Sequence, residues 1–107
     1  MAFYGDNACT RWVRFNGSGS VSINDSYQVS SITDNGTGQY YVNFTSPYQS
    51  NTVYATVCGG ASSNTSGAYD TWIVTNNQST QGVRVMGAIP SGWYDLGLAC
   101  VAIFGDL

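Results

Sequence analysis

The stretch SSITDNGTGQYYVNFTS, residues 30–46, constrains the fold more than any other part of the sequence. In its second half, residues alternate in the period-2 pattern of a strand with one apolar face, formed by Tyr40, Val42 and Phe44. Between the halves, DNGTG (34–38) suits a tight reversal, because Asn and Gly tolerate positive φ and the Asp34 carboxylate can accept hydrogen bonds from nearby amides. The stretch therefore predicts a β-hairpin in which Ile32 packs across from the apolar face.

The same kind of pattern recurs along the chain. Short runs rich in Val, Ile, Tyr, Thr and Phe are divided by clusters of Gly, Asn, Asp and Ser, and no stretch has a helical period. Besides the hairpin, strands are predicted at 11–16, 21–24, 52–61, 70–75, 82–88 and 97–105. About eight strands without crossover helices predict an all-β fold, an antiparallel β-sandwich of Greek-key or jelly-roll-like type. The composition has no break, so a single domain over residues 1–107 is expected.

The closing run ACVAIF, residues 99–104, is apolar on both of its faces. It should therefore be covered on both sides, either as a central strand or as a strand that meets a neighbouring subunit. With Trp12 and a charged fraction of only 8%, the chain has more apolar area than one small core hides. We expect a homotrimer with the last strand or Trp12 near the threefold axis.

Charge and residue types argue against several classes of function. The only cations are three Arg and the net charge is -3, so the chain has no basic stripe for nucleic acid. His and Lys are absent, which removes the usual general bases, and the six Asp lie mostly in turns. Transition metals prefer His or clustered Cys, and no regular acidic calcium loop occurs. We therefore expect no enzyme, no metal and no cofactor.

The three cysteines, Cys9, Cys58 and Cys100, are far apart and lack metal-ligand spacing. The N-terminal residues lack the features of an export signal, and no apolar run is long enough to cross a bilayer. We expect a protein made in the cytoplasm, without membrane insertion, whose thiols are buried and reduced. A bridge between Cys58 and Cys100 stays open as an alternative.

Aromatic residues in or beside polar loops are the main candidates for a ligand site. An aromatic ring can stack on the apolar face of a pyranose while a carboxylate binds its hydroxyls. The candidate ligand-binding residues are Tyr69, Asp70, Trp72, Trp93, Tyr94 and Asp95. Large rings at strand ends more commonly pack on the core or against another subunit, so that interpretation stays open as well.

Residues 11–46, RWVRFNGSGSVSINDSYQVSSITDNGTGQYYVNFTS, resemble a segment near the C-terminus of tail fibre and related virion proteins of tailed bacteriophages. In those proteins a Trp-Val-x-Phe-Asn-Gly strand precedes the same SSITDNGTG hairpin and a VNF strand. A following YA strand matches Tyr54 and Ala55, and the ending CVAIFG (100–105) is also typical. The chain departs from this pattern at three positions. Arg14 stands where those proteins often carry Asn, and Gln28 and Gln39 stand where Asn and Asp are common.

The resemblance implies a trimeric β-sandwich knob on the outer surface of a phage particle. Its variable loops, at 62–70, 76–81 and 89–95, would bind a bacterial surface polysaccharide, and its other partners would be virion proteins. A fibre subunit normally carries a long shaft before this domain, so the chain is expected to be an excised tip or a small virion protein. The alternative within the same resemblance is a capsid decoration or head-fibre protein that stabilises or ornaments the phage head.

Overall fold

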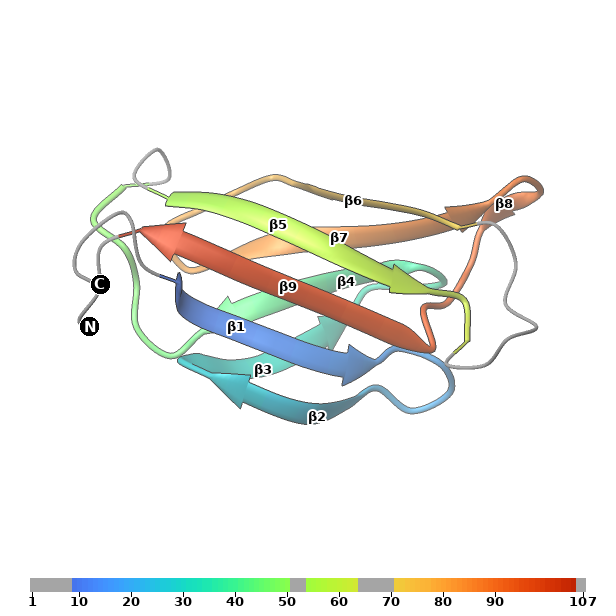
Figure 1. Cartoon of the computed structure of the whole chain (residues 1–107), viewed down its shortest axis with the longest axis horizontal. Helices are drawn as coiled ribbons and strands as arrows, with labels where there is room; N and C mark the ends of the chain where they lie inside the picture. Colours follow the sequence, from blue (N-terminus) through green and yellow to red (C-terminus); the bar gives the residue numbers. More distant parts are fainter. Residues whose placement is uncertain (1–8, 51–53, 64–70, 106–107) are drawn as a thin grey trace.

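The structure, a computed structural model, describes residues 9–50, 54–63 and 71–105. In these residues the chain forms two antiparallel sheets packed face to face, which confirms the predicted all-β sandwich (Figure 1). The strands are β1 Cys9–Asn16, β2 Ser22–Tyr27, β3 Val29–Asp34, β4 Gln39–Phe44, β5 Tyr54–Ala61, β6 Trp72–Asn76, β7 Gly82–Ile89, β8 Gly92–Trp93 and β9 Leu98–Gly105.

One sheet, called sheet A here, has the strand order β2-β1-β9-β5. The other, sheet B, has the order β3-β4-β7-β6, and the short strand β8 also pairs with β7. The chain passes from one sheet to the other between β2 and β3, between β4 and β5, between β5 and β6, and between β8 and β9. Strands distant in sequence, such as β1 and β9, therefore lie side by side at the centre of sheet A (Figure 1).

The hairpin predicted from residues 30–46 is formed by β3 and β4. Ile32 lies opposite Val42 and packs against the core, as the alternation predicts. In the turn, the Asp34 carboxylate accepts a hydrogen bond from the Gly36 amide at 3.0 Å, and Gly36 has a φ of 124°. A side chain at that φ would be strained, so glycine is required in this reversal.

The core consists of the inward-facing residues of the two sheets. Sheet A contributes fully buried side chains from β1 and β9, and sheet B contributes them from β4 and β7. The largest apolar members are Val13, Phe15, Tyr40, Val42, Val83, Val85, Leu96, Val101 and Ile103. Each such side chain stabilises the folded state by about 1.5–3 kcal/mol through removal from water.

A tyrosine of sheet B joins the two sheets at one end of the sandwich. The hydroxyl of Tyr40 lies 3.0 Å from the Gly17 carbonyl, in the turn between β1 and β2, and 3.1 Å from the Asp95 carboxylate. It also accepts a hydrogen bond from the Leu96 amide at 3.0 Å. A Cβ at Gly17 would overlap the Tyr40 ring, so only glycine lets this turn approach so closely.

A buried arginine lies among aromatic rings at the other end. The guanidinium of Arg11 lies 3.8 Å from the centroid of the Tyr48 ring and 4.7 Å from that of Phe44. It donates a hydrogen bond to the Ser46 carbonyl, and the Tyr48 ring stacks on Tyr54 with centroids 4.5 Å apart. Cation–π contacts of a desolvated guanidinium stabilise by about 2 kcal/mol, which helps to offset its burial.

The cysteines differ from the sequence-based prediction. All three are free, as expected, but Cys9 and Cys100 are exposed, so the prediction that they are buried was wrong. Cys100 faces outward because residues of β9 alternate between the two faces of sheet A, and a register shift between Cys9 and Arg11 makes Cys9 the cross-strand partner of the exposed Phe104. Cys58 is half-buried and points inward, donating to the Ile73 carbonyl at 3.7 Å, so Cys58 and Cys100 project to opposite faces and form no bridge.

The last strand, β9, is central in its sheet, which was one of the two alternatives predicted for it. Its inner face consists of the buried side chains of Ala99, Val101 and Ile103. Its outer face carries the exposed side chains of Cys100 and Phe104, which no other described strand covers. In the part of the chain that the structure describes, no helix has the length and apolar character needed to span a membrane.

Replacing Tyr40 with Phe tests the connection between the sheets. The Tyr40→Phe substitution removes the hydroxyl and leaves the Gly17 carbonyl and the Leu96 amide without this partner in a buried position. We expect the free energy of unfolding in urea to fall by about 1–3 kcal/mol. The control is Tyr27→Phe on the exposed surface, which should change it by less than about 0.5 kcal/mol. Equal effects of the two substitutions would contradict the assigned role.

Two buried tyrosines, Tyr40 and Tyr54, predict how the free energy of unfolding changes at alkaline pH. Burial raises the pKa of Tyr54 to about 12, and burial likewise raises the pKa of Tyr40 above its ordinary value. An unfolded tyrosine titrates near pH 10, so stability should be constant below about pH 10 and fall as the pH rises toward about 12. Urea unfolding between pH 8 and 11.5 measures this fall, which should be less steep in Tyr54→Phe. A slope unchanged by that substitution would refute the explanation.

Candidate functional site

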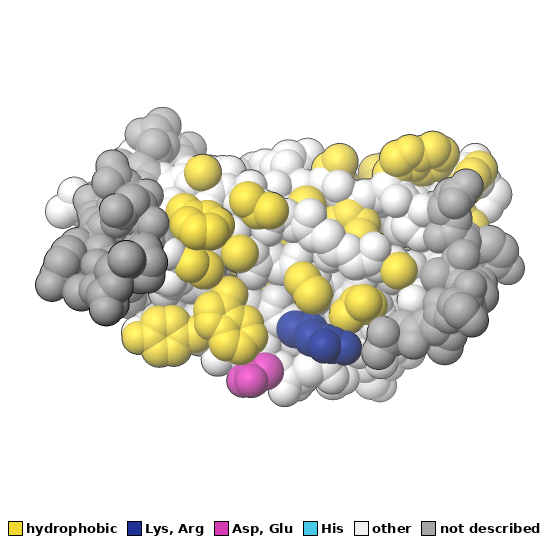
Figure 2. Space-filling view, viewed as in Figure 1, with side chains coloured by type: hydrophobic (Ala, Val, Ile, Leu, Met, Phe, Trp, Pro, Cys, Tyr) yellow, Lys and Arg dark blue, Asp and Glu magenta, His cyan; other side chains and the backbone are white. Residues whose placement is uncertain are grey.

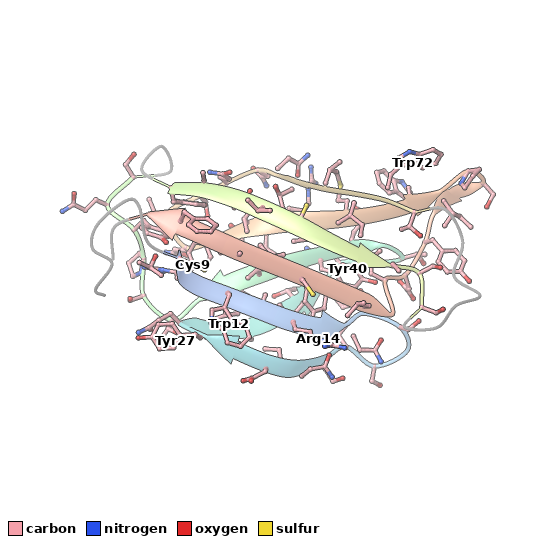
Figure 3. All side chains as sticks on the ribbon, in the orientation of Figure 1. Cys9, Trp12, Arg14, Tyr27, Tyr40 and Trp72 are labelled. Carbon is pink, nitrogen blue, oxygen red and sulfur yellow. The ribbon has the colours of Figure 1, made fainter. Side chains whose placement is uncertain are left out.

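Two exposed tryptophans lie close together on the outer face of sheet B. Trp72 of β6 and Trp93 of β8 are both direct partners of Ala88 on β7, one on each side of it. Cross-strand partners point to the same face of a sheet, so the two indoles flank the methyl group of Ala88. Their side chains are 59% and 53% exposed, which places neither in the core. Figure 3 shows Trp72 projecting away from the sandwich, at the end of β6. Trp72, Ala88 and Trp93 are called the tryptophan row below.

The position of Trp93 depends on a hairpin that the sequence did not predict. Residues 89–95 were expected to form a loop, but Ile89 pairs with Gly92 across a two-residue turn, and this pairing creates β8. The chain is then held by a hydrogen bond of 3.1 Å from the Tyr94 amide to the Gly87 carbonyl. Trp93 is therefore fixed to a strand rather than carried on a loop.

Next to the tryptophan row, the outer face of sheet B becomes progressively more polar. Val74 and Met86 form the neighbouring row, with Gln39 on the other side of Met86. In the row beyond, Arg84 donates to the Asn76 amide oxygen at 2.9 Å. Adjacent strands lie about 4.8 Å apart, which puts the Cα atoms of Trp72 and Trp93 roughly 10 Å from each other. The face thus offers stacking surfaces with hydrogen-bonding groups on one side.

Asp95 and Tyr94, two other candidates from the sequence, are placed in the fold rather than on the open face. The Asp95 carboxylate accepts hydrogen bonds from the Gly38 amide at 2.9 Å and from the Tyr40 hydroxyl at 3.1 Å. Tyr94 is half-buried. Asp95 therefore stabilises the hairpin end of sheet B, which positions the nearby Trp93.

The remaining candidates and loops do not all gather at one place. Tyr69 and Asp70 lie outside the described residues. The loop at 76–81 precedes β7 and the segment 89–95 follows its last residues, so these two loops lie at opposite ends of that strand. Ser79 of the first loop is bonded to the Tyr41 hydroxyl at 2.5 Å. Among the predicted site residues that the structure describes, only Trp72 and Trp93 lie together on one exposed face.

Ala88 is the residue that sequence reasoning missed. The methyl side chain of Ala88 gives no sign of a role in binding, because its contribution is to leave room between the two larger tryptophan side chains. The signal that could have found it is the sequence Ile-Pro-Ser-Gly-Trp, residues 89–93, in which Pro and Gly around Ser favour a turn. That turn places Trp93 beside Ala88.

Metal chemistry has little support in the described part of the chain. Residues 9–50, 54–63 and 71–105 contain no group of three or more His, Cys, Asp or Glu side chains that could hold an ion. The arrangement on sheet B suits contact with an apolar or partly apolar surface instead.

Comparison of the chain with protein-family models, curated proteins and solved structures finds no match. Function is therefore inferred from the chemistry of the exposed side chains and from the sequence resemblance described above.

The assigned role of Asp95 can be tested by substitution. Asp95→Ala removes the acceptor of the Gly38 amide and of the Tyr40 hydroxyl, so we expect the free energy of unfolding to fall by about 1–3 kcal/mol. Asp25→Ala is the control, because Asp25 is exposed and bonds only to the adjacent Ser26 amide among the contacts the structure gives it. Thermal unfolding of both variants measures the difference. A loss of stability in Asp25→Ala as large as in Asp95→Ala would contradict this assignment.

Proposed function

We propose that this protein is a tail fibre tip domain on the virion of a tailed bacteriophage, which binds a polysaccharide of the host cell surface. The observation that carries the proposal is the tryptophan row, in which Trp72 and Trp93 flank Ala88 on an exposed face. Indole rings stack on the apolar faces of sugars, and large side chains gathered on an exposed face commonly mark a binding site.

The chemistry around the row supports a sugar as the ligand. A sugar needs hydrogen-bonding groups beside the stacking rings, and Gln39, Arg84 and Asn76 lie on the same face in the neighbouring rows. The Cα atoms that carry the two indoles are roughly 10 Å apart on one face, so a chain of sugars can contact both rings at once. The rings are held on strands, which reduces the entropy lost on binding.

The phage assignment is supported by the resemblance of residues 11–46 and of the closing CVAIFG to virion proteins. In this proposal the partners are other virion proteins and bacterial polysaccharide, without nucleic acid, membrane insertion or a cofactor. In this proposal the domain binds without cleaving; glycoside cleavage would need a facing pair of carboxyl side chains. Of the three described Asp, Asp25 and Asp34 accept hydrogen bonds from nearby amides and Asp95 lies in the Tyr40 network.

The tryptophan row gives the main test of this function. Trp72→Ala and Trp93→Ala should each weaken binding of oligosaccharides from candidate host polysaccharides roughly tenfold or more, because each removes one stacking surface. Calorimetry with short oligosaccharides measures the affinity of a single site. Trp12→Ala is the matched control, since Trp12 lies on the outer face of the opposite sheet and should leave this affinity unchanged.

Two further results would overturn parts of the proposal. Undiminished binding by both Trp72→Ala and Trp93→Ala would remove the site. Release of reducing sugar from the polysaccharide would show cleavage and make the protein an enzyme. Labelling of virions with an antibody to the chain should mark the tail, whereas a signal on the head alone would favour a capsid decoration or head-fibre protein.

A further inference from the structure

Among the residues that the structure describes, the outer face of sheet B carries one charged side chain, that of Arg84. Arg84 lies on β7 between Val83 and Val85, whose side chains are fully buried, so its own side chain points outward, as Ala88 does. Arg84 precedes Ala88 by four residues, which places it roughly 13 Å along the strand from the tryptophan row. Arg84 and the tryptophan row therefore belong to one continuous surface.

The guanidinium of Arg84 is held from one side only. Its Nε donates to the amide oxygen of Asn76 at 2.9 Å, and Asn76 is the direct partner of Arg84 across β6 and β7. The two terminal nitrogens of Arg84 have no hydrogen-bond or ion-pair partner among the described residues. The edge that these two nitrogens form matches the two oxygens of a carboxylate. Asn76 thus orients the guanidinium and leaves this edge available.

In the described part of the chain, no carboxylate lies on the same face as Arg84. Asp34 pairs with the inward-facing Tyr40 at the hairpin turn, and Asp95 bonds to the Tyr40 hydroxyl. Asp25 lies on sheet A, where it is the direct cross-strand partner of Arg14. Figure 2 shows that opposite face, with a basic and an acidic side chain both at its surface. The positive charge on sheet B therefore has no counterpart on its own face.

The row between Arg84 and the tryptophan row suits a sugar chain. Met86 lies there, with Val74 on one side and Gln39 on the other. A sugar presents apolar C–H faces, which can contact Met86 and Val74, and hydroxyl groups, which can bond to the Gln39 amide. A polysaccharide that stacks on the tryptophan row can thus follow β7 as far as Arg84.

From this arrangement we infer that the polysaccharide bound by the tryptophan row is acidic, and that the two terminal nitrogens of Arg84 bind the carboxylate of a uronic acid sugar. Asn76 is a positioning residue for that contact. The inference rests on the proposed function and names the class of its ligand. The net charge of the chain is -3, so the protein has no general attraction for a polyanion. Selectivity for an acidic sugar therefore comes from this one side chain.

Chemical reduction of the sugar carboxyl group tests the inference. Calorimetry compares short bacterial oligosaccharides that contain glucuronic or galacturonic acid with the same oligosaccharides after the carboxyl is reduced to a hydroxymethyl group. The wild type should bind an acidic form at least tenfold more tightly than its reduced form, because reduction removes a charge-assisted pair of hydrogen bonds. Added salt should weaken binding of the acidic form and leave that of the reduced form unchanged.

Substitutions of Arg84 assign this preference to its guanidinium. Arg84→Gln should bind both forms with the affinity that the wild type has for the reduced form. Arg84→Lys keeps the charge but lacks the planar pair of donors, so it should retain only part of the preference. Arg14→Gln is the matched control, because it removes the same charge from the outer face of sheet A and should leave the preference unchanged.

The positioning role of Asn76 has its own measurement. Asn76→Ala removes the acceptor of the Arg84 Nε, so the ratio of the affinities for the acidic and reduced forms should fall severalfold. The affinity for the reduced form should stay the same, which a general loss of structure would not allow. Thermal unfolding verifies that each variant is folded. An unchanged ratio in Asn76→Ala would reject this role.

The inference and the proposed function can fail separately. Equal affinity of the wild type for the acidic and reduced forms, no binding of any acidic form, or an undiminished preference in Arg84→Gln would overturn the inference. Tryptophan-dependent binding without such a preference would reject the inference alone and keep the proposed site. Binding that is undiminished in both Trp72→Ala and Trp93→Ala would reject the proposed site, and the inference with it.

Discussion

The hydroxyl of Tyr40 is the contact on which one end of this sandwich depends. It connects sheet B to the turn of sheet A at Gly17 and to the segment at Asp95 and Leu96, through which the chain leaves β8 for β9. Because Asp95 also binds the Gly38 amide, the same network holds the start of β4. A single buried polar group therefore closes the end of the fold at which the tryptophan row lies.

Local patterns predicted the parts of the fold that local chemistry determines. The hairpin of β3 and β4 follows from alternation and from the turn residues Asp34 and Gly36, and the inward face of β1 follows from Val13 and Phe15. The pairing of β1 with β9 could not be predicted, because the register of distant strands is set by packing between the sheets.

The candidate site was predicted in its residue types and not in its geometry. Trp72 and Trp93 were identified as aromatic residues near loops, but their meeting across Ala88 requires β8, which forms from a segment expected to be a loop. A sugar-binding site can use a carboxylate such as that of Asp95. Only its hydrogen-bond partners in the fold, the Gly38 amide and the Tyr40 hydroxyl, show that Asp95 has a structural role. Sequence composition identifies which groups can bind a ligand, while tertiary contacts decide which are available.

Trp72 on β6 and Trp93 on β8 both pair with Ala88 of β7, and this limits how the recognised ligand can change. The spacing of the Cα atoms at positions 72 and 93 is set by the hydrogen-bond ladders of β6 and β8 with β7, so it stays the same when the side chains there are exchanged. In the proposed role, a new host polysaccharide could be accommodated by point changes at 72, 88 or 93 alone. Adaptation of this kind needs no insertion and leaves both sheets of the scaffold as they are.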